Sequence, residues 1–306
     1  MRIAVLGAGA MGSLYGGYLS RSNDVTLVDH SEEKAALIRS QGVTIHEPDG
    51  STGIYRPNCV ADTSDLGAMD LVILFTKAMY SGDALKKNKG LIGPQTYLLT
   101  LQNGAGHEEI LAPYAAREHV AIGTTEHNCS LLSPGVIRHG GGGKTHLGLA
   151  FGDSGALSDV ARAFEDCGFQ TVLHDDIQHL IWNKLFINAS SSVVSGILQV
   201  NQGFLLESAH GWALVEQLVR EAVEVARAKG QPFAYEDVIA HVRAVVSSAP
   251  AGFTSLYADL KNGRRTEVDT ISGAVARAAE QTGVPAPTHA FVVNLVHALE
   301  EKAMRP

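Results

Sequence analysis

A glycine-rich loop near the amino terminus constrains the fold of this chain more than any other feature. An apolar segment, Arg2–Leu6, leads into Gly7-Ala8-Gly9-Ala10-Met11-Gly12, and a helix rich in small residues is predicted to follow as far as Leu19. A strand, a Gly-x-Gly-x-x-Gly loop and a helix in this order are typical of a dinucleotide-binding βαβ unit. The glycines allow a tight turn, close approach of the backbone to a pyrophosphate, and close packing of the helix, whose N-terminus faces the phosphates. We therefore expect the residues from Gly7 to Gly12 to bind a dinucleotide.

The second predicted strand, Asp24–Asp29, ends on a carboxylate that lies 22 residues after Gly7. This spacing is close to that of the acid that binds the adenosine ribose hydroxyls. A carboxylate there also repels a 2′-phosphate, and no arginine follows directly, since His30 and Ser31 come next. The alternative is that Asp29 only caps a turn with Ser31. The expected cofactor is therefore NAD or NADP, and Asp29 favours NAD.

Polar residues follow two further predicted strands. Asp70–Phe75 precedes Thr76-Lys77-Ala78, and Thr96–Leu101 precedes Gln102-Asn103-Gly104. Doubly wound sheets bind their ligands at the carboxyl ends of their strands, so we expect Lys77 and Asn103 to meet the cofactor. The alternatives are a solvated lysine and an ordinary Asn-Gly turn.

The pattern of elements changes near residue 175. Before it, strands at Thr145–Leu149 and Gln170–Leu173 flank a predicted helix at Ser158–Cys167. After it, helical periodicity extends over 177–199, 207–229, 235–247, 252–262 and 267–282, with breaks at glycine and proline. The sequence therefore predicts an α/β Rossmann-type, doubly wound domain at 1–174 and an all-α domain at 175–306.

Composition and spacing argue against several other classes of protein. The net charge of −8 and the pI near 5.9 make nucleic acid an unexpected partner, and apolar stretches such as Leu71–Phe75 are too short to span a membrane. Cys59, Cys129 and Cys167 are widely spaced, which favours a reducing compartment, the cytoplasm. The thirteen histidines lack metal-site spacing and are expected mainly at the surface, so no metal is expected. The segment 138–145 resembles a phosphate-binding loop but lacks its first glycine, and we interpret it as a hairpin turn.

Two polar clusters in the helical part carry candidate chemistry. Lys184, Asn188 and Ser192 are spaced at i, i+4 and i+8, so that they share one face of a helix on which an ammonium and an amide can hold a substrate oxygen. The alternative for Lys184 is a surface lysine. The second cluster, 264–269, contains Glu267, whose alternative role is a charge in a first helical turn with Thr266 as N-cap and Asp269 closing a capping box.

These clusters belong to a set of motifs that resembles the ketopantoate reductases in order and spacing over nearly the whole chain. The motifs are Gly7 to Gly12, Thr76-Lys77-Ala78, Leu101-Gln-Asn103-Gly104, Gly123-Thr-Thr125, Pro134 to His139, Trp182 to Asn188, Arg265-Thr-Glu267-Val-Asp269 and Gly283-Val-Pro285.

The resemblance implies catalytic roles for Lys184, as general acid, and for Glu267, which would bind substrate and orient the site. It implies that Asn188 and Ser255 hold the substrate, and that Lys77 and Asn103 touch cofactor and substrate. The implied reaction, in pantothenate biosynthesis, reduces ketopantoate or a related branched 2-keto acid to the 2-hydroxy acid with NAD(P)H. A small-molecule substrate is thus the expected partner, and a homodimer is one assembly that the sequence allows.

Two positions depart from the family pattern. Ser192 stands where the family helix usually carries a second asparagine, which recognises the far end of ketopantoate. Asp29 favours NAD, whereas the family usually prefers NADP. Either change affects specificity and leaves the reaction type intact. One alternative is a related 3-hydroxyacid or glycerol-3-phosphate-type dehydrogenase, which would not be expected to carry the 265–269 segment. The other is a non-catalytic dinucleotide sensor, which would have lost the catalytic acid, whereas Lys184 and Glu267 are present here.

Overall fold

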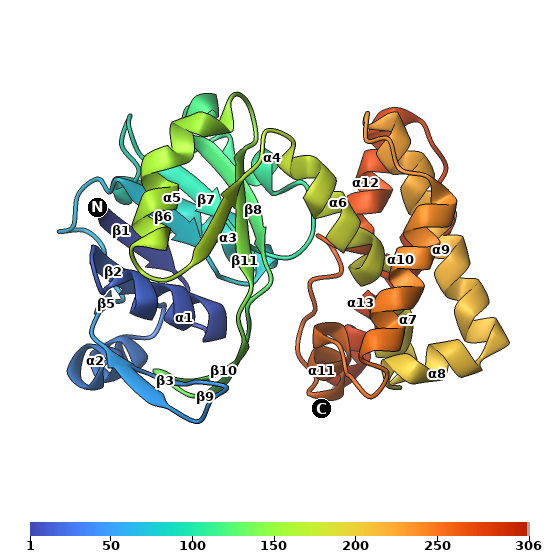
Figure 1. Cartoon of the computed structure of the whole chain (residues 1–306), viewed down its shortest axis with the longest axis horizontal. Coiled ribbons are helices and arrows are strands. Elements are labelled where there is room, and N and C mark those ends of the chain that lie inside the picture. Colours follow the sequence, from blue (N-terminus) through green and yellow to red (C-terminus); the bar gives the residue numbers. More distant parts are fainter. Residues whose placement is uncertain (305–306) are drawn as a thin grey trace. The chain divides into compact units, whose positions relative to one another are not determined.

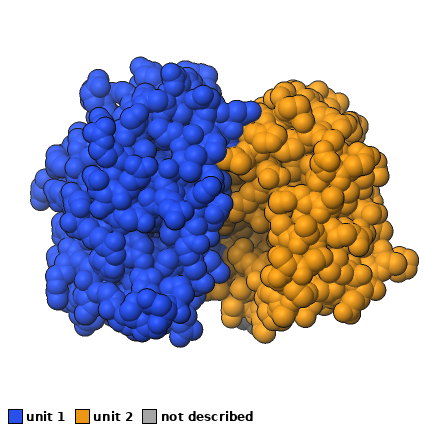
Figure 2. Space-filling view, in the orientation of Figure 1, with its two compact units in different colours: residues 1–102, 107–177 blue, residues 103–106, 178–306 orange. Residues whose placement is uncertain are grey.

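The structure is a computed structural model that describes residues 1–304, and the chain divides into two compact units (Figures 1 and 2). Unit 1 consists of residues 1–102 and 107–177, and unit 2 consists of residues 103–106 and 178–306. The sequence placed a domain boundary after residue 174. The short segment 103–106, which the sequence assigned to the first domain, groups with the helical unit because it bonds to a turn near residue 270.

The large sheet of unit 1 confirms the predicted Rossmann-type fold. In spatial order its strands are β12 (Gln170–Leu173), β11 (Lys144–Leu149), β8 (Val120–Thr125), β7 (Tyr97–Thr100), β6 (Leu71–Leu74), β1 (Arg2–Leu6), β2 (Asp24–Val28) and β5 (Asn58–Val60). The six strands from β8 to β5 run parallel, β11 pairs antiparallel with β8, and β12 pairs parallel with β11.

Helices cover both faces of this sheet, which explains its continuous apolar strands. In β1, Ile3 and Val5 pack into one core while Ala4 and Leu6 pack into another, since successive side chains point to opposite faces. The helices of unit 1 are α1 (Ala10–Leu19), α2 (Glu32–Gln41), α3 (Ser81–Lys87), α4 (His107–Leu111) and α5 (Ser158–Glu165). Residues of α1 and α5 belong to the first core, and residues of α3 and α4 to the second.

A second, smaller sheet was not predicted, and it corrects one interpretation of the sequence. Its order is β4 (Thr52–Tyr55), β3 (Val43–His46), β10 (Val136–Gly141) and β9 (Asn128–Ser133). The hairpin turn lies at Pro134-Gly135, where Gly135 has φ +74°. The segment interpreted as a hairpin turn, 138–145, instead carries the chain from β10 of the small sheet to β11 of the large one. That interpretation was wrong because the glycine run there bends one strand of a long ribbon between two sheets.

Unit 2 is helical among its described residues, as the sequence predicted. Its helices are α6 (Ile177–Ile187, which starts on the last residue of unit 1), α7 (Val193–Leu198), α8 (Gln202–Glu207), α9 (Ala209–Ala228), α10 (Tyr235–Ser248), α11 (Ser255–Lys261), α12 (Ser272–Thr282) and α13 (Pro287–Met304). In Figure 1, α9 and α10 run beside each other in this unit, and these helices are in contact.

Two helices of unit 2 were not predicted, α8 and α13. Helix α13 begins at Pro287, which favours the first turn of a helix, inside a segment that we expected only as a break. Helix α12 also begins later than predicted, because residues 267–271 form a turn instead of helix. Among residues 1–304, no helix is long and apolar enough to cross a membrane.

Candidate active site

The glycine loop has the geometry that a bound dinucleotide requires. Gly7 has φ +104°, and a Cβ atom there would lie 2.7 Å from the backbone nitrogen of Thr76. A Cβ at Gly12 would lie 1.8 Å from the carbonyl oxygen of Gly7, so these two glycines are fixed by the protein itself. A Cβ at Gly9 would meet no atom within 4 Å in the described chain. The space in front of Gly9 is therefore open, and a Cβ would partly fill the place in which a pyrophosphate fits.

Helix α1 begins directly behind this loop. Its N-cap residue is Gly9, so within residues 1–304 no side chain caps the first N–H groups of the helix. These groups, from the turn that contains Ala10 and Met11, are donors suited to phosphate oxygens. The residues present thus fit a dinucleotide.

Asp29 follows β2 and is nearly buried, with 5% of its surface exposed. Its Oδ1 accepts a hydrogen bond from the backbone N–H of Ser31 at 3.2 Å, so the turn-capping alternative is present. Its Oδ2 lies 2.7 Å from the Nζ of Lys34, and that ion pair was not predicted from the sequence. The signal was available, since Lys34 lies five residues after Asp29 in the first turn of the next helix. Any preference between NAD and NADP therefore depends on both residues.

The loops after β6 and β7 are joined by Gln102, which the sequence analysis did not single out. Its Nε2 donates to the carbonyl oxygen of Thr76 at 2.6 Å and to Oγ of Ser81 at 2.9 Å, and its Oε1 accepts from Thr100 Oγ1 at 2.8 Å. Lys77 is half-buried and lies between Thr76 and Ser81 in the sequence, directly before a 3₁₀ turn. Gln102 therefore fixes the backbone that presents Lys77.

Helix α6 ends in a widened, π-helical turn at Asn188–Ser192. The hydroxyls of Ser190 and Ser191 donate to the carbonyl oxygens of Phe186 and Ile187, one turn back. Such bonds compete with the α-helical pattern, and π turns of this kind are frequent at functional sites.

The π turn changes which residues share the helical face predicted for Lys184, Asn188 and Ser192. Lys184 and Asn188 are one regular turn apart and both are half-buried, while Trp182 and Phe186 are in the core. Ser192, also half-buried, lies at the far end of the widened turn, so the i, i+4, i+8 spacing of a regular helix does not describe its direction. The shared face that we predicted is therefore supported for Lys184 and Asn188 alone.

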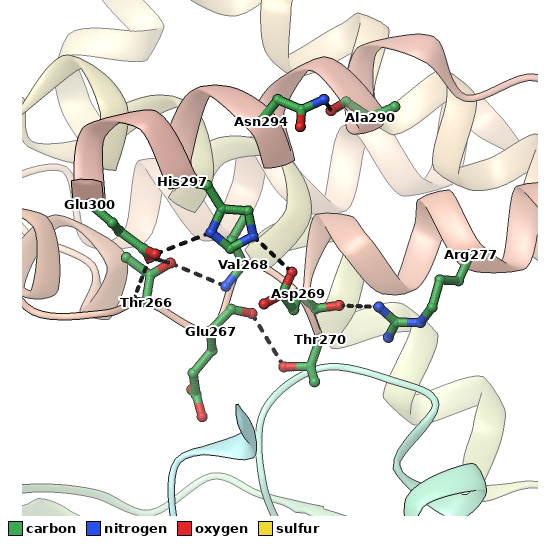
Figure 3. Close-up of polar contacts among 10 residues, drawn as sticks. All are labelled: Thr266, Glu267, Val268, Asp269, Thr270, Arg277, Ala290, Asn294, His297 and Glu300. Carbon is green, nitrogen blue, oxygen red and sulfur yellow. Dashed lines mark hydrogen bonds and ion pairs between the residues drawn. The ribbon is translucent and has the colours of Figure 1, made fainter. Parts of the chain in front are cut away.

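Glu267 lies in a turn that is held on one side by α13 (Figure 3). Thr266 Oγ1 accepts from the N–H of Val268 at 3.2 Å, as a capping threonine would, but the residues after it form a turn and not the first turn of a helix. Asp269 does not close a capping box. Its Oδ1 bonds to His297 Nε2 at 3.0 Å, so the capping-box alternative is wrong in that part.

The same turn binds the loop that contains Asn103. The carbonyl oxygen of Thr270 accepts from the N–H of Ala105 at 3.0 Å, and Thr270 Oγ1 lies 3.3 Å from the carbonyl oxygen of Asn103. A Cβ at Gly104 would lie 2.1 Å from the Thr270 carbonyl oxygen, so the glycine after Asn103 is required for this approach. The structure thus brings the segments of Asn103 and Glu267 together.

Ser255 is exposed and is the first residue of α11. The residue before it, Thr254, caps the helix by accepting from Tyr257 N–H, and its hydroxyl lies 3.3 Å from the carbonyl oxygen of Ser192. This contact places the start of α11 against the π turn. Ser255 and Ser192 are therefore on adjoining elements of unit 2.

The histidines correct a further prediction. All thirteen lie in the described part of the chain, and of these His30, His210 and His241 are exposed while the others are half-buried or buried. His127 and His139 stack with 3.0 Å between ring nitrogens, and burial followed by the charge of His139 lowers the pKa of His127. Within residues 1–304, no three His, Cys, Asp or Glu side chains are grouped so as to hold a metal ion.

Comparison with known proteins shows the family to which the chain belongs. The family model "Ketopantoate reductase PanE/ApbA" matches residues 3–151, and its C-terminal counterpart matches residues 176–300. The 2-dehydropantoate 2-reductases of Halobacterium salinarum and Lactococcus lactis are 34% and 32% identical, over 97% and 98% of this chain and 98% of each relative. A structure of D-mandelate dehydrogenase with NADH and anilino(oxo)acetate is 32% identical, with a TM-score of 0.91 and 99% of both chains covered. The chain therefore belongs to the ketopantoate reductase family and is an NAD(P)-dependent oxidoreductase.

Proposed function

We propose that this protein reduces a branched or bulky 2-keto acid, such as ketopantoate, to the corresponding 2-hydroxy acid. The observation that carries the proposal is the placement of Lys184 near the end of α6 and of Asn188 one turn later, as the first residue of the π turn. An ammonium and an amide presented in this way can bind the oxygen atoms of a keto acid. The curated relatives that bear the name 2-dehydropantoate 2-reductase support the same reaction.

NAD(P)H, when bound at the glycine loop, would supply the hydride that reduces the keto carbon, and negative charge would then develop on the former carbonyl oxygen. In the proposal, the Lys184 ammonium hydrogen-bonds to that oxygen and donates the proton that converts it into a hydroxyl. Asn188 holds the acid by hydrogen bonds, and Glu267 binds the substrate and orients the site. Ser255 and Asn103 complete the contacts with the substrate, Ser192 recognises its far end, and Lys77 contacts the cofactor.

For the cofactor, we propose a preference for NADH. The Asp29 carboxylate can accept hydrogen bonds from ribose hydroxyls and repels a 2′-phosphate. Lys34 reduces that repulsion, since its Nζ is 2.7 Å from the carboxylate, and we therefore expect a moderate preference. The solved D-mandelate dehydrogenase complexes with NADH support the use of this cofactor.

A second candidate substrate is an aromatic 2-keto acid. Ser192 is shorter than the asparagine that the family usually carries there, so it leaves room for a bulkier group at the far end of the substrate. The structural similarity to a D-mandelate dehydrogenase, whose product or substrate carries a phenyl ring, favours this candidate.

The cytoplasmic location and the homodimer stay predictions.

A panel of acids assayed with NADH and with NADPH tests the proposal. Ketopantoate, 3-methyl-2-oxobutanoate and phenylglyoxylate would be compared by kcat/KM, while 3-hydroxyisobutyrate and glycerol 3-phosphate, tested in the oxidative direction, represent the alternative dehydrogenases. We expect a 2-keto acid to be reduced at least tenfold more efficiently than any alternative substrate is oxidised. Binding of dinucleotide without turnover of any acid would instead favour a sensor.

A further inference from the structure

We propose that Glu300 and His297 of α13 are positioning residues, which hold the turn Thr266–Thr270 so that Glu267 is correctly placed for the substrate. The inference rests on the proposed function in one respect, the role of Glu267 in substrate binding. Neither Glu300 nor His297 was singled out from the sequence. Both lie in a helix that the sequence pattern did not predict.

Glu300 holds the first residue of the turn by two bonds. Its Oε1 accepts from the backbone N–H of Thr266 and from the Thr266 hydroxyl, both at 2.7 Å. Glu300 is only 6% exposed and Thr266 only 2%. Hydrogen bonds to an ionised acceptor are short and strong, and a buried carboxylate without them would be costly. The pair therefore fixes Thr266 firmly against α13.

His297 joins this carboxylate to the far side of the turn. Its Nδ1 lies 3.2 Å from Oε2 of Glu300, and its Nε2 lies 3.0 Å from Oδ1 of Asp269. The imidazole thus bridges the carboxylate of Glu300 on α13 and that of Asp269 in the turn. Arg277 of α12 adds a bond at 2.8 Å to the carbonyl oxygen of Asp269.

The side chain of Glu267 points away from this network. In Figure 3 it extends to the side opposite Glu300 and His297, so these two residues of α13 lie behind the backbone that carries the Glu267 carboxylate. The Glu267 carbonyl oxygen accepts from the N–H of Thr270 at 3.1 Å. Because Thr270 also bonds to the segment of Asn103, a shift of the turn would move two predicted substrate contacts together.

A buried carboxylate such as that of Glu300 contributes little net stability, because its removal from water carries a large desolvation penalty. An apolar residue of similar size often stabilises a fold as well or better, whereas a charged, multiply bonded acceptor fixes geometry. The positioning role therefore accounts for the chemistry of Glu300, where simple packing of α13 would not require a carboxylate.

The test compares Thr266→Val with Thr266→Ser, using the 2-keto acid of the panel above that is reduced most efficiently. Valine removes the hydroxyl that donates to Glu300, and serine keeps it. We expect Thr266→Val to raise KM for the acid about tenfold with a smaller fall in kcat, and with dinucleotide Kd within twofold of the wild type. Thr266→Ser should restore KM to within threefold of the wild type.

The chain offers a matched control at the other end of α13. Thr288 donates to Glu221 through both its backbone N–H and its hydroxyl, as Thr266 does to Glu300, but it carries no predicted site residue. Thr288→Val should lower Tm as much as Thr266→Val does and should leave KM unchanged. Equal effects of the two variants on KM, or a Tm loss in Thr266→Val without a KM change, would overturn the positioning role.

Glu267→Gln separates this proposal from the proposed function. If Glu267→Gln has wild-type kinetics, Glu267 has no role in substrate binding and the proposed function fails at that residue. If Glu267→Gln is impaired and Thr266→Val is not, only the positioning role fails. Should Thr266→Val not fold, Glu300→Gln keeps an acceptor oxygen for Thr266 without the charge. It should raise KM about threefold, and an unchanged KM would contradict the proposal.

Discussion

The glycine loop of unit 1 and the Glu267 turn of unit 2 are built in opposite ways. The loop consists of six consecutive residues, and its shape follows from what a Cβ atom would meet at Gly7 and Gly12. The turn depends on side chains from α12 and α13, which lie up to 34 residues away in sequence. A site made from backbone is thus disrupted by adding atoms, whereas a site made from side chains is disrupted by removing them.

Removing the ammonium of Lys184 should have the largest effect. If it protonates the developing alkoxide, Lys184→Ala should lower kcat on the order of a hundredfold or more, or about 2.7 kcal/mol in the activation free energy. The Kd for NADH should stay within threefold of the wild type. Lys229→Ala, on an exposed lysine at the end of α9, is the control and should have wild-type kinetics. Wild-type turnover in Lys184→Ala would remove that lysine from the mechanism.

Adding a methyl group to the glycine loop should affect binding of the cofactor instead. Gly9→Ala meets no protein atom within 4 Å, so Tm should be nearly unchanged while NADH affinity falls at least tenfold through contact with the pyrophosphate. In Gly12→Ala the added Cβ would lie 1.8 Å from the Gly7 carbonyl oxygen, so both Tm and the affinity for NADH should fall. Calorimetric titration with NADH and thermal unfolding measure the two effects. Equal losses of Tm in both variants would contradict the open space in front of Gly9.

The contrast between these regions also explains what the sequence could predict. The loop, the strands β1, β2, β6 and β7, and the helical second unit follow from local patterns of glycine and apolar residues. The partners of Asp269 and Thr266 could not be predicted, because His297 and Glu300 lie in a helix that follows a proline-rich break and contact the turn only in the folded unit. The π turn at Asn188 was missed because helical spacing assumes a regular turn. A run of three serines there was the available signal.

Asp29 combines features of the glycine loop and of the Glu267 turn. Its position follows from the local sequence, whereas its ion pair with Lys34 was not predicted. Asp29→Ser should remove the repulsion of a 2′-phosphate and release the Lys34 ammonium, so the ratio of kcat/KM for NADH to that for NADPH should fall about tenfold. In the double variant with Lys34→Ala, the gain for NADPH should disappear. Wild-type efficiency that is equal with both cofactors would contradict the predicted preference.

The smallest effect should be a dependence of stability on pH in the side-chain-built turn. Burial disfavours the charged form of His297, but the hydrogen bonds to Asp269 and Glu300 outweigh it and raise the pKa above its ordinary value of 6.5. A histidine whose pKa is raised on folding contributes stability fully below pH 6.5, and that contribution is lost as pH rises through the folded pKa. The wild type should therefore exceed His297→Gln in Tm by on the order of 2 °C at pH 6 and by less at pH 9.

The control for this measurement is His241→Gln, which removes an exposed imidazole from α10. Its Tm difference from the wild type should not change between pH 6 and pH 9. The glycine loop contains no ionisable side chain, so the pH dependence assigned to His297 belongs to the turn and not to the loop. Buried His289 has a lowered pKa, mainly through desolvation, and costs stability as pH falls below 6.5, in both proteins alike. Subtracting one Tm curve from the other cancels it, and a difference that grows toward pH 9 would show that the bridge between Asp269 and Glu300 does not depend on a protonated imidazole.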